Sequence, residues 1–445
     1  MKILFISLGC DKNLADSEEM LGLLTGSGHE IVDSEEEADA IVVNTCCFIH
    51  DAKEESVNTI LEMAEYKTSG SCKVLIVTGC MAQRYKEEII QEIPEVDAVL
   101  GTTSYGDIVK ALNEAQAGNV FQEFRDINDL PEDSGCRVIT TGGHFGYLKI
   151  AEGCDKHCTY CIIPSLRGKF RSVPEERLLK QAEYMASQGV KELILVAQET
   201  TVYGTDLYGK KTLHILLKKL CQIKGIRWIR ILYCYPEEIY DELIQVMKEE
   251  KKICHYLDLP IQHASDRILR RMGRRTSKAQ LVDIITKLRR EIPDIVLRTS
   301  LITGFPGETE EDHQELMEFV DEMEFDRLGV FTYSPEEGTP AETMEGQVPE
   351  ELKEERRDEI MELQQEISLE KGDSRIGQEL LVMIEGKVSG ESAYIGRTYG
   401  DAPKVDGYIF VQTGELLVTG DFAKVKVTGA LEYDLIGELA DEYTE

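Results

Sequence analysis

The sequence predicts an α/β protein made of three consecutive domains. Its 445 residues exceed the length of one ordinary domain, and its 42% hydrophobic composition supports several packed cores. Short apolar runs alternate with amphipathic stretches up to about residue 345, and short alternating strands separated by glycines follow. We expect a doubly wound α/β domain over residues 1–130, a partial (β/α)6 barrel of the TIM type over 140–371 and a small antiparallel β-barrel over 372–445.

Three apolar runs of the first segment end alike, in a turn that carries a cysteine. Residues 3–7 lead to Cys10, residues 40–43 to Cys46 and residues 74–77 to Cys80. In an open parallel sheet the carboxyl ends of the strands lie on one edge, where ligands bind. We therefore expect the three cysteines to face one another in space. Buried free thiols, which behave as small hydrophobic groups, are the alternative.

The middle segment repeats one pattern six times: a β-rich run that ends in polar residues, and then a helical stretch. The runs cover residues 146–153, 192–200, 227–236, 256–265, 295–307 and 327–340. Six such units, with crossovers of this length, predict a partial barrel whose active site lies at the carboxyl ends of its strands.

A charged helix at about residues 349–371 introduces the third segment. Alternating runs at 380–384, 408–411 and 423–427, with glycines between them, then indicate a small antiparallel barrel. We expect linkers near residues 126–143 and 338–349.

The most informative motif is CxxxCxxC, formed by Cys154, Cys158 and Cys161 on the loop after the first barrel strand. Three thiolates this close together can hold three corners of a cubane iron–sulfur cluster, which leaves the fourth iron open. A zinc site that also uses His157 is the alternative. Zinc sites of this kind usually pair two separated cysteine hooks, and no second hook is present, so the spacing favours the cluster.

This spacing, with Tyr160 just before the last cysteine, resembles the signature of the radical S-adenosylmethionine enzymes. The resemblance implies that S-adenosylmethionine chelates the open iron and is split to a 5′-deoxyadenosyl radical. Radical chemistry is needed when a C–H bond is not acidic enough for a positioned base to remove its proton. Tyr160 is then a candidate contact to adenine, and Gln198, Gln262 and Arg298 to the amino-acid or ribose portions. An ordinary strand-end hydrogen bond is the alternative for each.

The segments around Cys10, Cys46 and Cys80 resemble the amino-terminal domain of methylthiotransferases, and the terminal barrel resembles a TRAM domain. This resemblance covers essentially the whole chain. It implies that these three cysteines hold an auxiliary 4Fe–4S cluster that carries the transferred sulfur, so the expected cofactors are two 4Fe–4S clusters and S-adenosylmethionine. Relatives often carry a small residue at the position of Cys47. Because adjacent strand residues point to opposite faces, we assign Cys46 to the cluster.

The methylthiotransferase family divides between substrates, modifying either adenosine in tRNA or a ribosomal protein. Residues 372–445 contain 6 Lys or Arg against 14 Asp or Glu. A phosphate-binding barrel should be basic, whereas an acidic one suits a basic ribosomal protein. Four motifs, at residues 161–168, 257–263, 331–340 and 401–403, resemble the RimO branch, which methylthiolates the β-carbon of an aspartate in small-subunit ribosomal protein twelve.

One feature favours RNA instead: the cluster Arg270, Arg271, Arg274 and Arg275, which is either an RNA-binding patch or a solvated helix end. We predict the ribosomal-protein enzyme, with tRNA modification as the alternative. A non-catalytic iron–sulfur electron carrier or RNA-binding protein is the more distant alternative.

Composition limits the partners and the compartment. The net charge of −34 argues against a protein that coats nucleic acid, and no apolar run is long enough to cross a membrane. Twelve cysteines without an export signal indicate metal or redox chemistry in a reducing cytoplasm. We expect a basic ribosomal protein as substrate and an electron donor as partner; nucleic-acid contact is not favoured and no membrane is expected.

Overall fold

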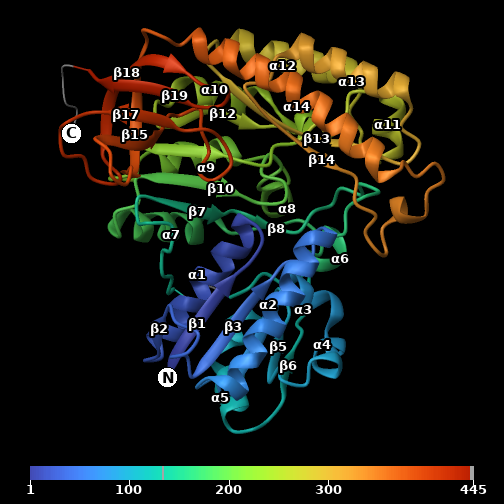
Figure 1. The fold of residues 1–445 in the computed structure, drawn as a ribbon, viewed down its shortest axis with the longest axis vertical. Coiled ribbons are helices and arrows are strands. Elements are labelled where there is room, and N and C mark those ends of the chain that lie inside the picture. Colours follow the sequence, from blue (N-terminus) through green and yellow to red (C-terminus); the bar gives the residue numbers. More distant parts are fainter. Residues whose placement is uncertain (133–134, 441–445) are drawn as a thin grey trace.

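A computed structural model describes residues 1–132 and 135–440, which fold into an amino-terminal α/β region, a central half-barrel and a terminal β-barrel (Figure 1). The first region holds a six-stranded parallel sheet in the order β2-β1-β3-β4-β5-β6. Its strands are β1 (Lys2–Ser7), β2 (Glu30–Val32), β3 (Ala40–Thr45), β4 (Val74–Gly79), β5 (Ala98–Leu100) and β6 (Phe121–Glu123). The doubly wound sheet predicted from the alternating runs is confirmed.

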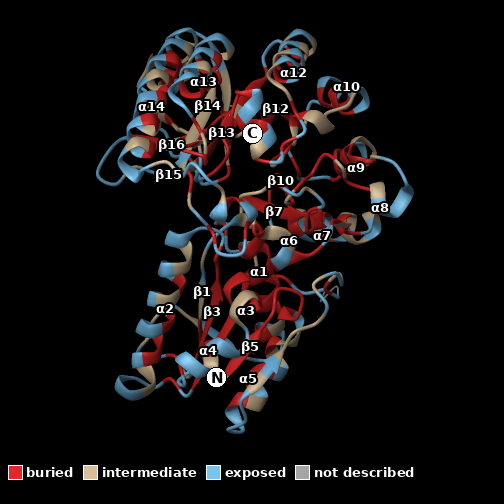
Figure 2. Ribbon diagram, turned by 90° about the vertical axis from the view of Figure 1, so that its right-hand side faces the viewer, coloured by how far each residue is buried: buried red, intermediate tan, exposed pale blue. Residues whose placement is uncertain are grey.

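Helices cover both faces of this sheet because alternate strand residues feed two separate apolar clusters. One face packs against α1 (Asp11–Gly26) and α5 (Ile108–Gln116), which follows the short 3-10 helix η1 (Tyr105–Asp107). The other packs against α2 (His50–Ser69), α3 (Cys80–Tyr85) and α4 (Glu87–Glu92). Figure 2 shows the buried strands between these helices; α2 has an exposed outer side, whereas α1 and α3 are largely buried.

The strand register brings the cysteine-bearing turns to the same edge. Thr45 pairs with Gly79, so Cys46 and Cys80 follow two paired positions of β3 and β4. Ser7 pairs with Asn44, and the Leu8 amide donates to the Asn44 carbonyl at 2.9 Å. The turn after β1 therefore ends beside the turn after β3.

The central region is an open, parallel half-barrel in the order β14-β13-β12-β11-β10-β7. Its six strands match the six predicted runs: β7 (Phe145–Lys149), β10 (Glu192–Val196), β11 (Trp228–Ile231), β12 (Ile253–Asp258), β13 (Val296–Thr303) and β14 (Arg327–Thr332). A small hairpin of β8 (Ala151–Glu152) and β9 (Arg171–Ser172) extends beyond β7. The partial (β/α)6 barrel is thus confirmed.

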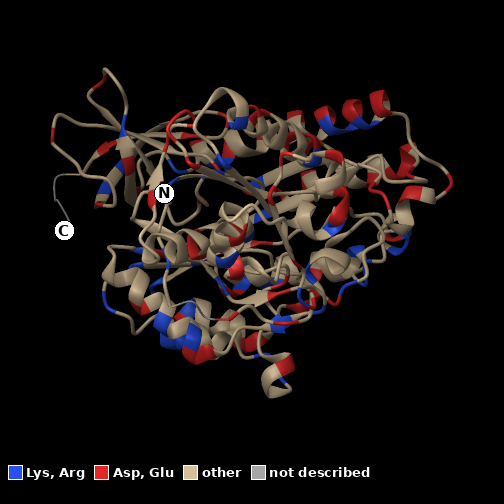
Figure 3. Cartoon of the chain, turned by 90° about the horizontal axis from the view of Figure 1, so that it is seen from below, with Lys and Arg blue, Asp and Glu red and all other residues tan. Residues whose placement is uncertain are grey.

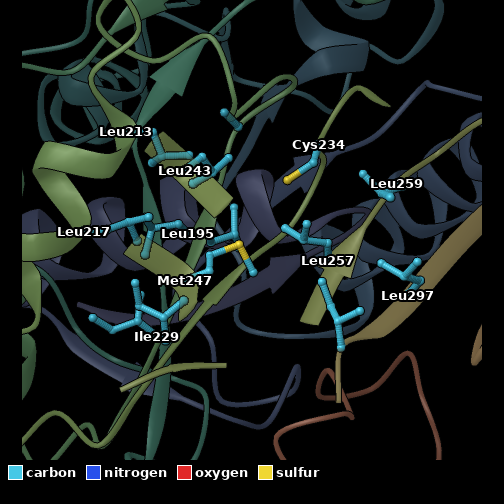
Figure 4. Close-up of a cluster of buried hydrophobic side chains, with 14 of the residues drawn as sticks. Leu195, Leu213, Leu217, Ile229, Cys234, Leu243, Met247, Leu257, Leu259 and Leu297 are labelled. Atoms are coloured by element: carbon cyan, nitrogen blue, oxygen red, sulfur yellow. The ribbon is translucent and has the colours of Figure 1, made fainter. Parts of the chain in front are cut away.

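Helices pack on the convex side of the half-barrel against its largest apolar cluster. Figure 4 shows part of this cluster, in which Leu195, Ile229 and Leu257 of three strands meet Leu217 and Met247 of the helices. The helical segments of the region are α6 (Ile163–Arg167), α7 (Glu175–Ser187), α8 (Thr205–Tyr208), α9 (Leu213–Leu220), η2 (Pro236–Glu238), α10 (Asp241–Glu249), α11 (Asp266–Arg271), α12 (Lys278–Glu291), α13 (Glu310–Met323), η3 (Pro340–Thr343) and α14 (Glu350–Asp373).

The carboxyl-terminal strands close into a barrel in the order β15-β16-β17-β19-β18. They are β15 (Glu379–Lys387), β16 (Ala393–Arg397), β17 (Ile409–Gln412), β18 (Phe422–Ala430) and β19 (Leu435–Leu439). The predicted small barrel is confirmed, with two strands that the sequence patterns did not indicate, β16 and β19. One detail differs from the antiparallel expectation: β17 and β19 pair in parallel, which closes the barrel.

This barrel packs against the concave side of the half-barrel. Phe422 stands edge-on to Trp228, with ring centroids 4.8 Å apart. Beside them, Glu192 of β10 lies between Arg230 and Arg397, at 2.8 and 2.7 Å, and all three side chains are fully buried. No described helix is long and apolar enough to cross a membrane.

Candidate functional site

The structure brings Cys10, Cys46 and Cys80 together at the edge of the amino-terminal sheet. Cys10 is the N-cap of α1, Cys46 follows β3, and Cys80 opens α3. Burial, together with the neighbouring Cys80 and Cys10, raises the pKa of Cys46 to about 11. Burial likewise raises the pKa of Cys80. These thiols keep their protons unless a cation compensates them, as a bound metal centre does.

Gly9 and Asn13 hold two of the cysteine turns against each other. Gly9 has φ +84°, and a Cβ at this position would lie 2.8 Å from the Cys46 sulfur. Only glycine fits this left-handed conformation and close approach without strain. The Asn13 side-chain amide donates to the Leu8 carbonyl at 2.8 Å and to the Thr45 carbonyl at 3.0 Å.

The assignment of Cys46 rather than Cys47 assumes that strand β3 continues through both residues. Because β3 ends at Thr45, the alternation of faces does not extend to Cys46 and Cys47. Cys46 is the one of the two whose electrostatic neighbours include both Cys10 and Cys80. Cys47 is fully buried in the apolar cluster beneath α3, and burial raises its pKa to about 12.

Cys154, Cys158 and Cys161 lie together on the loop between β8 and α6. The Cys161 amide donates to the Cys158 carbonyl at 3.1 Å, and the Lys156 amide donates to the Cys154 sulfur at 3.4 Å. Burial raises the pKa of Cys154 to about 11 and that of Cys161 to about 12, with Cys158 contributing to both. Cys154 and Cys161 therefore also need a compensating cation, such as a bound metal centre, in order to ionise.

The zinc alternative requires several donors around one ion. Across residues 1–132 and 135–440, no three His, Cys, Asp or Glu side chains are grouped as a single metal ion would need. This finding applies equally to the two cysteine trios, so it does not separate the zinc alternative from the iron–sulfur one.

Two acceptors without partners lie at the end of β10, next to the radical-motif loop. Glu199 accepts from the Thr201 amide at 3.0 Å through Oε1, while its Oε2 and the Oε1 of Gln198 have no hydrogen-bond partner in the described chain. Glu199 is buried and near Cys154, and burial raises its pKa to about 7. Both acceptors fit a positively charged or N–H-bearing ligand such as the methionine end of S-adenosylmethionine.

Arg274 supplies the opposite charge. Its guanidinium carbon lies 4.3 Å from the centre of the Tyr235 ring, and its Nη2 donates to the Pro260 carbonyl at 2.8 Å. Its Nε and Nη1 are buried without a partner among the described residues. The Tyr235 hydroxyl in turn lies 3.7 Å from the Cys158 sulfur. A buried guanidinium with spare donors fits a carboxylate ligand.

The other members of the arginine cluster lie elsewhere. Arg271 donates to the carbonyls of Pro306 and Glu345, whereas Arg270 and Arg275 are exposed. The four arginines therefore do not form one surface patch.

The remaining predicted cofactor contacts have other partners in the structure. Tyr160 stands edge-on to Phe305, with ring centroids 6.3 Å apart. Arg298 donates to Asp258 at 2.8 Å and lies 3.5 Å from Asp406 of the terminal barrel. Gln262 has a left-handed backbone (φ +72°) that bridges to Leu301. Their roles in cofactor binding stay predictions.

Sequence patterns did not single out Glu199 or Tyr235, and they singled out Arg274 only as a member of the arginine cluster, not as a cofactor contact. Glu199 and Tyr235 were detectable in principle, since each is a polar residue at the end of a barrel strand. The inward orientation of Arg274 was not detectable from the sequence, because only tertiary packing distinguishes it from its exposed neighbours Arg270 and Arg275.

The segment after β11 joins the two cysteine trios. Tyr235 contacts Cys158, whereas Tyr233, two positions earlier, donates to Asp11 at 3.3 Å and lies near Cys10. The ammonium of Lys12 lies 3.2 Å from the centre of the Tyr233 ring. One short stretch of the half-barrel mouth therefore borders both trios.

A buried ionic network fixes this arrangement. Asp16 of α1 accepts from Arg167 of α6 at 2.8 Å and also pairs with Lys149 of β7. Glu152 of β8 completes the network, 3.3 Å from Arg167 and paired with Lys149. The helix that begins after Cys10 is thereby bound to the elements on both sides of the radical-motif loop.

Three family models match successive parts of the chain. Residues 2–101 match an uncharacterized family named UPF0004, residues 148–320 the radical SAM superfamily and residues 376–440 the TRAM domain. A protein of Lachnoclostridium phytofermentans, named ribosomal protein uS12 methylthiotransferase RimO, is 66% identical over 98% of this chain and 99% of its own length. This chain belongs to the RimO family. It is a radical S-adenosylmethionine methylthiotransferase.

Other RimO proteins are similar over their full length. The protein of Clostridium perfringens is 52% identical over 99% of this chain and 98% of its own length. The protein of Pelotomaculum thermopropionicum is also 52% identical, over 98% of this chain and 99% of its own length. Among solved structures, the radical S-adenosylmethionine methyltransferase TsrM of Kitasatospora setae has a TM-score of 0.54 at 11% identity, over 77% of this chain and 74% of that one. The cobalamin-dependent enzyme OxsB has a TM-score of 0.51 at 15% identity, over 82% and 56%. At these sequence identities, the two structures show only that the fold is shared.

Proposed function

We propose that this enzyme adds a methylthio group to the β-carbon of an aspartate in ribosomal protein uS12, the substrate in the names of its RimO relatives. Its cofactors are two 4Fe–4S clusters and S-adenosylmethionine. The observation that carries the proposal is the placement of two cysteine trios on either side of residues 233–235. A carbon activated at one trio can then reach sulfur carried at the other.

Each trio would hold three irons of one cluster and leave the fourth open. We assign Cys154, Cys158 and Cys161 to the cluster that binds S-adenosylmethionine, and Cys10, Cys46 and Cys80 to the auxiliary cluster. When bound, these groups supply one-electron cleavage of a sulfonium, a methyl group and a sulfur atom, chemistry that no side chain offers.

The chain's own part is to orient the ligands and exclude water. Glu199 would hold the α-amino group of S-adenosylmethionine, and Arg274 its carboxylate, because both carry spare polar atoms and lie near Cys154 and Cys158 of the radical-motif loop, respectively. Gln198 offers a further acceptor, and Tyr160 a ring for the adenine. Arg298, which pairs with Asp258 and Asp406, would donate a hydrogen bond to the ribose.

Charge favours the protein substrate over tRNA. Acidic residues outnumber basic ones by 83 to 49, and Figure 3 shows Asp and Glu distributed over the whole ribbon. A basic ribosomal protein is attracted to such a surface, whereas RNA phosphates are repelled. The TRAM domain is consistent with RNA contact, so we propose that the substrate can be met beside ribosomal RNA. We further propose a reducing, cytoplasmic setting and a separate electron-donor protein.

The experiment that tests the choice of substrate presents reconstituted enzyme with purified uS12 and, separately, with unmodified tRNA. Mass spectrometry then follows the gain of one methylthio group. We expect the gain on an aspartate of uS12. A gain on tRNA alone would contradict the proposal.

A further inference from the structure

Arg167 ends α6, directly after the radical motif, yet its side chain is directed towards the amino-terminal domain. Only 2% of this residue is exposed. One guanidinium nitrogen donates to Asp16 at 2.8 Å, and the other donates to the Asn13 side-chain oxygen at 2.9 Å. The radical domain thus places a buried cation beside the auxiliary cysteines.

Asn13 transmits this contact to two of the auxiliary turns. With its oxygen held by Arg167, its nitrogen donates to the carbonyl of Leu8, near Cys10, and to that of Thr45, just before Cys46. The third turn is reached by packing, since Leu166 shares an apolar cluster with Cys80 and Met81. All three auxiliary turns therefore contact α6 directly or through one side chain.

The positive charge of Arg167 also acts on all three thiols. It interacts electrostatically with Cys10, Cys46 and Cys80. Reduction of a cluster by one electron adds one negative charge to the iron–sulfur core and its thiolates. A fixed cation in a low-dielectric setting stabilises that reduced state and raises its reduction potential.

We propose that Arg167 is a positioning residue of the auxiliary cluster, which orients the turns of Cys10 and Cys46 through Asn13 and balances the charge of the thiolates. The inference rests on the proposed function, because it assumes a cluster at this trio. It follows that the auxiliary site of the amino-terminal domain is completed by a residue of the radical domain.

The test uses full-length chain in which Cys154, Cys158 and Cys161 are replaced by alanine, so that only the auxiliary cluster forms. Arg167→Gln and Arg167→Lys are introduced into this background and reconstituted anaerobically. Iron and sulfide per chain are measured, and the cluster is titrated with dithionite while its electron paramagnetic resonance signal is followed. Arg137→Gln is the matched control, since Arg137 is also a buried cation and pairs with Glu18 of α1 at 2.6 Å.

We expect Arg167→Gln to lose iron and to shift the potential of the remaining cluster to more negative values. Arg167→Lys, which keeps the charge and loses the forked contact, should lose iron while the potential stays near that of the parent. Arg137→Gln should change neither quantity. An unchanged iron content and potential in Arg167→Gln would overturn the inference.

Two further outcomes are decisive. If Arg167→Gln fails to fold, full iron content in Arg167→Lys overturns the positioning role. If the parent itself binds no cluster, the proposed auxiliary site fails, and this result is distinguishable from failure of the Arg167 inference alone.

Discussion

The carboxylate of Asp16 lies 2.8 Å from the guanidinium of Arg167, and both side chains are almost completely buried. These residues belong to different domains, so this ion pair ties the auxiliary site to the radical site. Removing one partner of a buried pair leaves an uncompensated charge, which is far more costly than losing an exposed pair.

We therefore expect Asp16→Asn to lower the free energy of unfolding by about 3 kcal/mol, because Arg167 and Lys149 lose a shared carboxylate. Glu37→Gln is the control: it breaks the exposed Lys2–Glu37 pair and should leave the free energy of unfolding nearly unchanged. Urea unfolding of both variants gives the comparison. Equal losses would show that the buried network does not stabilise the interface.

Cys47→Ala separates the two adjacent thiols. Since Cys46 is the assigned ligand, Cys47→Ala should keep about eight irons per chain after reconstitution, as two cubanes require. Loss of the buried sulfur should cost about 1 kcal/mol of stability. Cys46→Ala should instead fall to about four irons. The reverse result would move the auxiliary ligand to Cys47.

Glu199 should make the free energy of unfolding decrease as the pH rises. Its folded pKa of about 7 lies above the ordinary 4.5, so the native state keeps a proton that the unfolded chain releases. This carboxyl therefore lowers stability progressively as pH rises from about 4.5 to 7. We expect Glu199→Gln to stabilise the metal-free protein by up to about 3 kcal/mol at pH 8 and hardly at pH 4.5. Urea unfolding at the two pH values measures this difference, and an equal effect at both would contradict it.

Arg274 and Arg270 form a matched pair for ligand binding, one buried beside Tyr235 and one exposed. Loss of charged hydrogen bonds in Arg274→Gln should weaken binding of S-adenosylmethionine by about tenfold or more. Arg270→Gln should leave the affinity unchanged. Equilibrium dialysis against the reconstituted protein compares the two. Equal affinities would remove Arg274 from the cofactor pocket.

The main features of the fold were predictable because they depend on local patterns. Six β-rich runs that end in polar residues predicted the half-barrel, and three runs that end in cysteine predicted the edge of the first sheet. The parallel pairing of β17 with β19 was not predictable, since it depends on closure of the barrel rather than on either strand.

The candidate site was predictable only in part. CxxxCxxC is a local motif, and the other three cysteines followed from strand ends. The inward turn of Arg274 and the reach of Arg167 across the domain interface depend on tertiary packing, which neither spacing nor periodicity encodes.

The central claim, two clusters with separate tasks, is tested most directly by comparing Cys158→Ala with Cys46→Ala. Each variant is reconstituted with iron and sulfide, and cleavage of S-adenosylmethionine is measured beside methylthio transfer to uS12. We expect about four irons in each, with cleavage lost in Cys158→Ala and retained in Cys46→Ala, and with transfer lost in both. Cleavage that persists in Cys158→Ala, or transfer that persists in Cys46→Ala, would contradict the account.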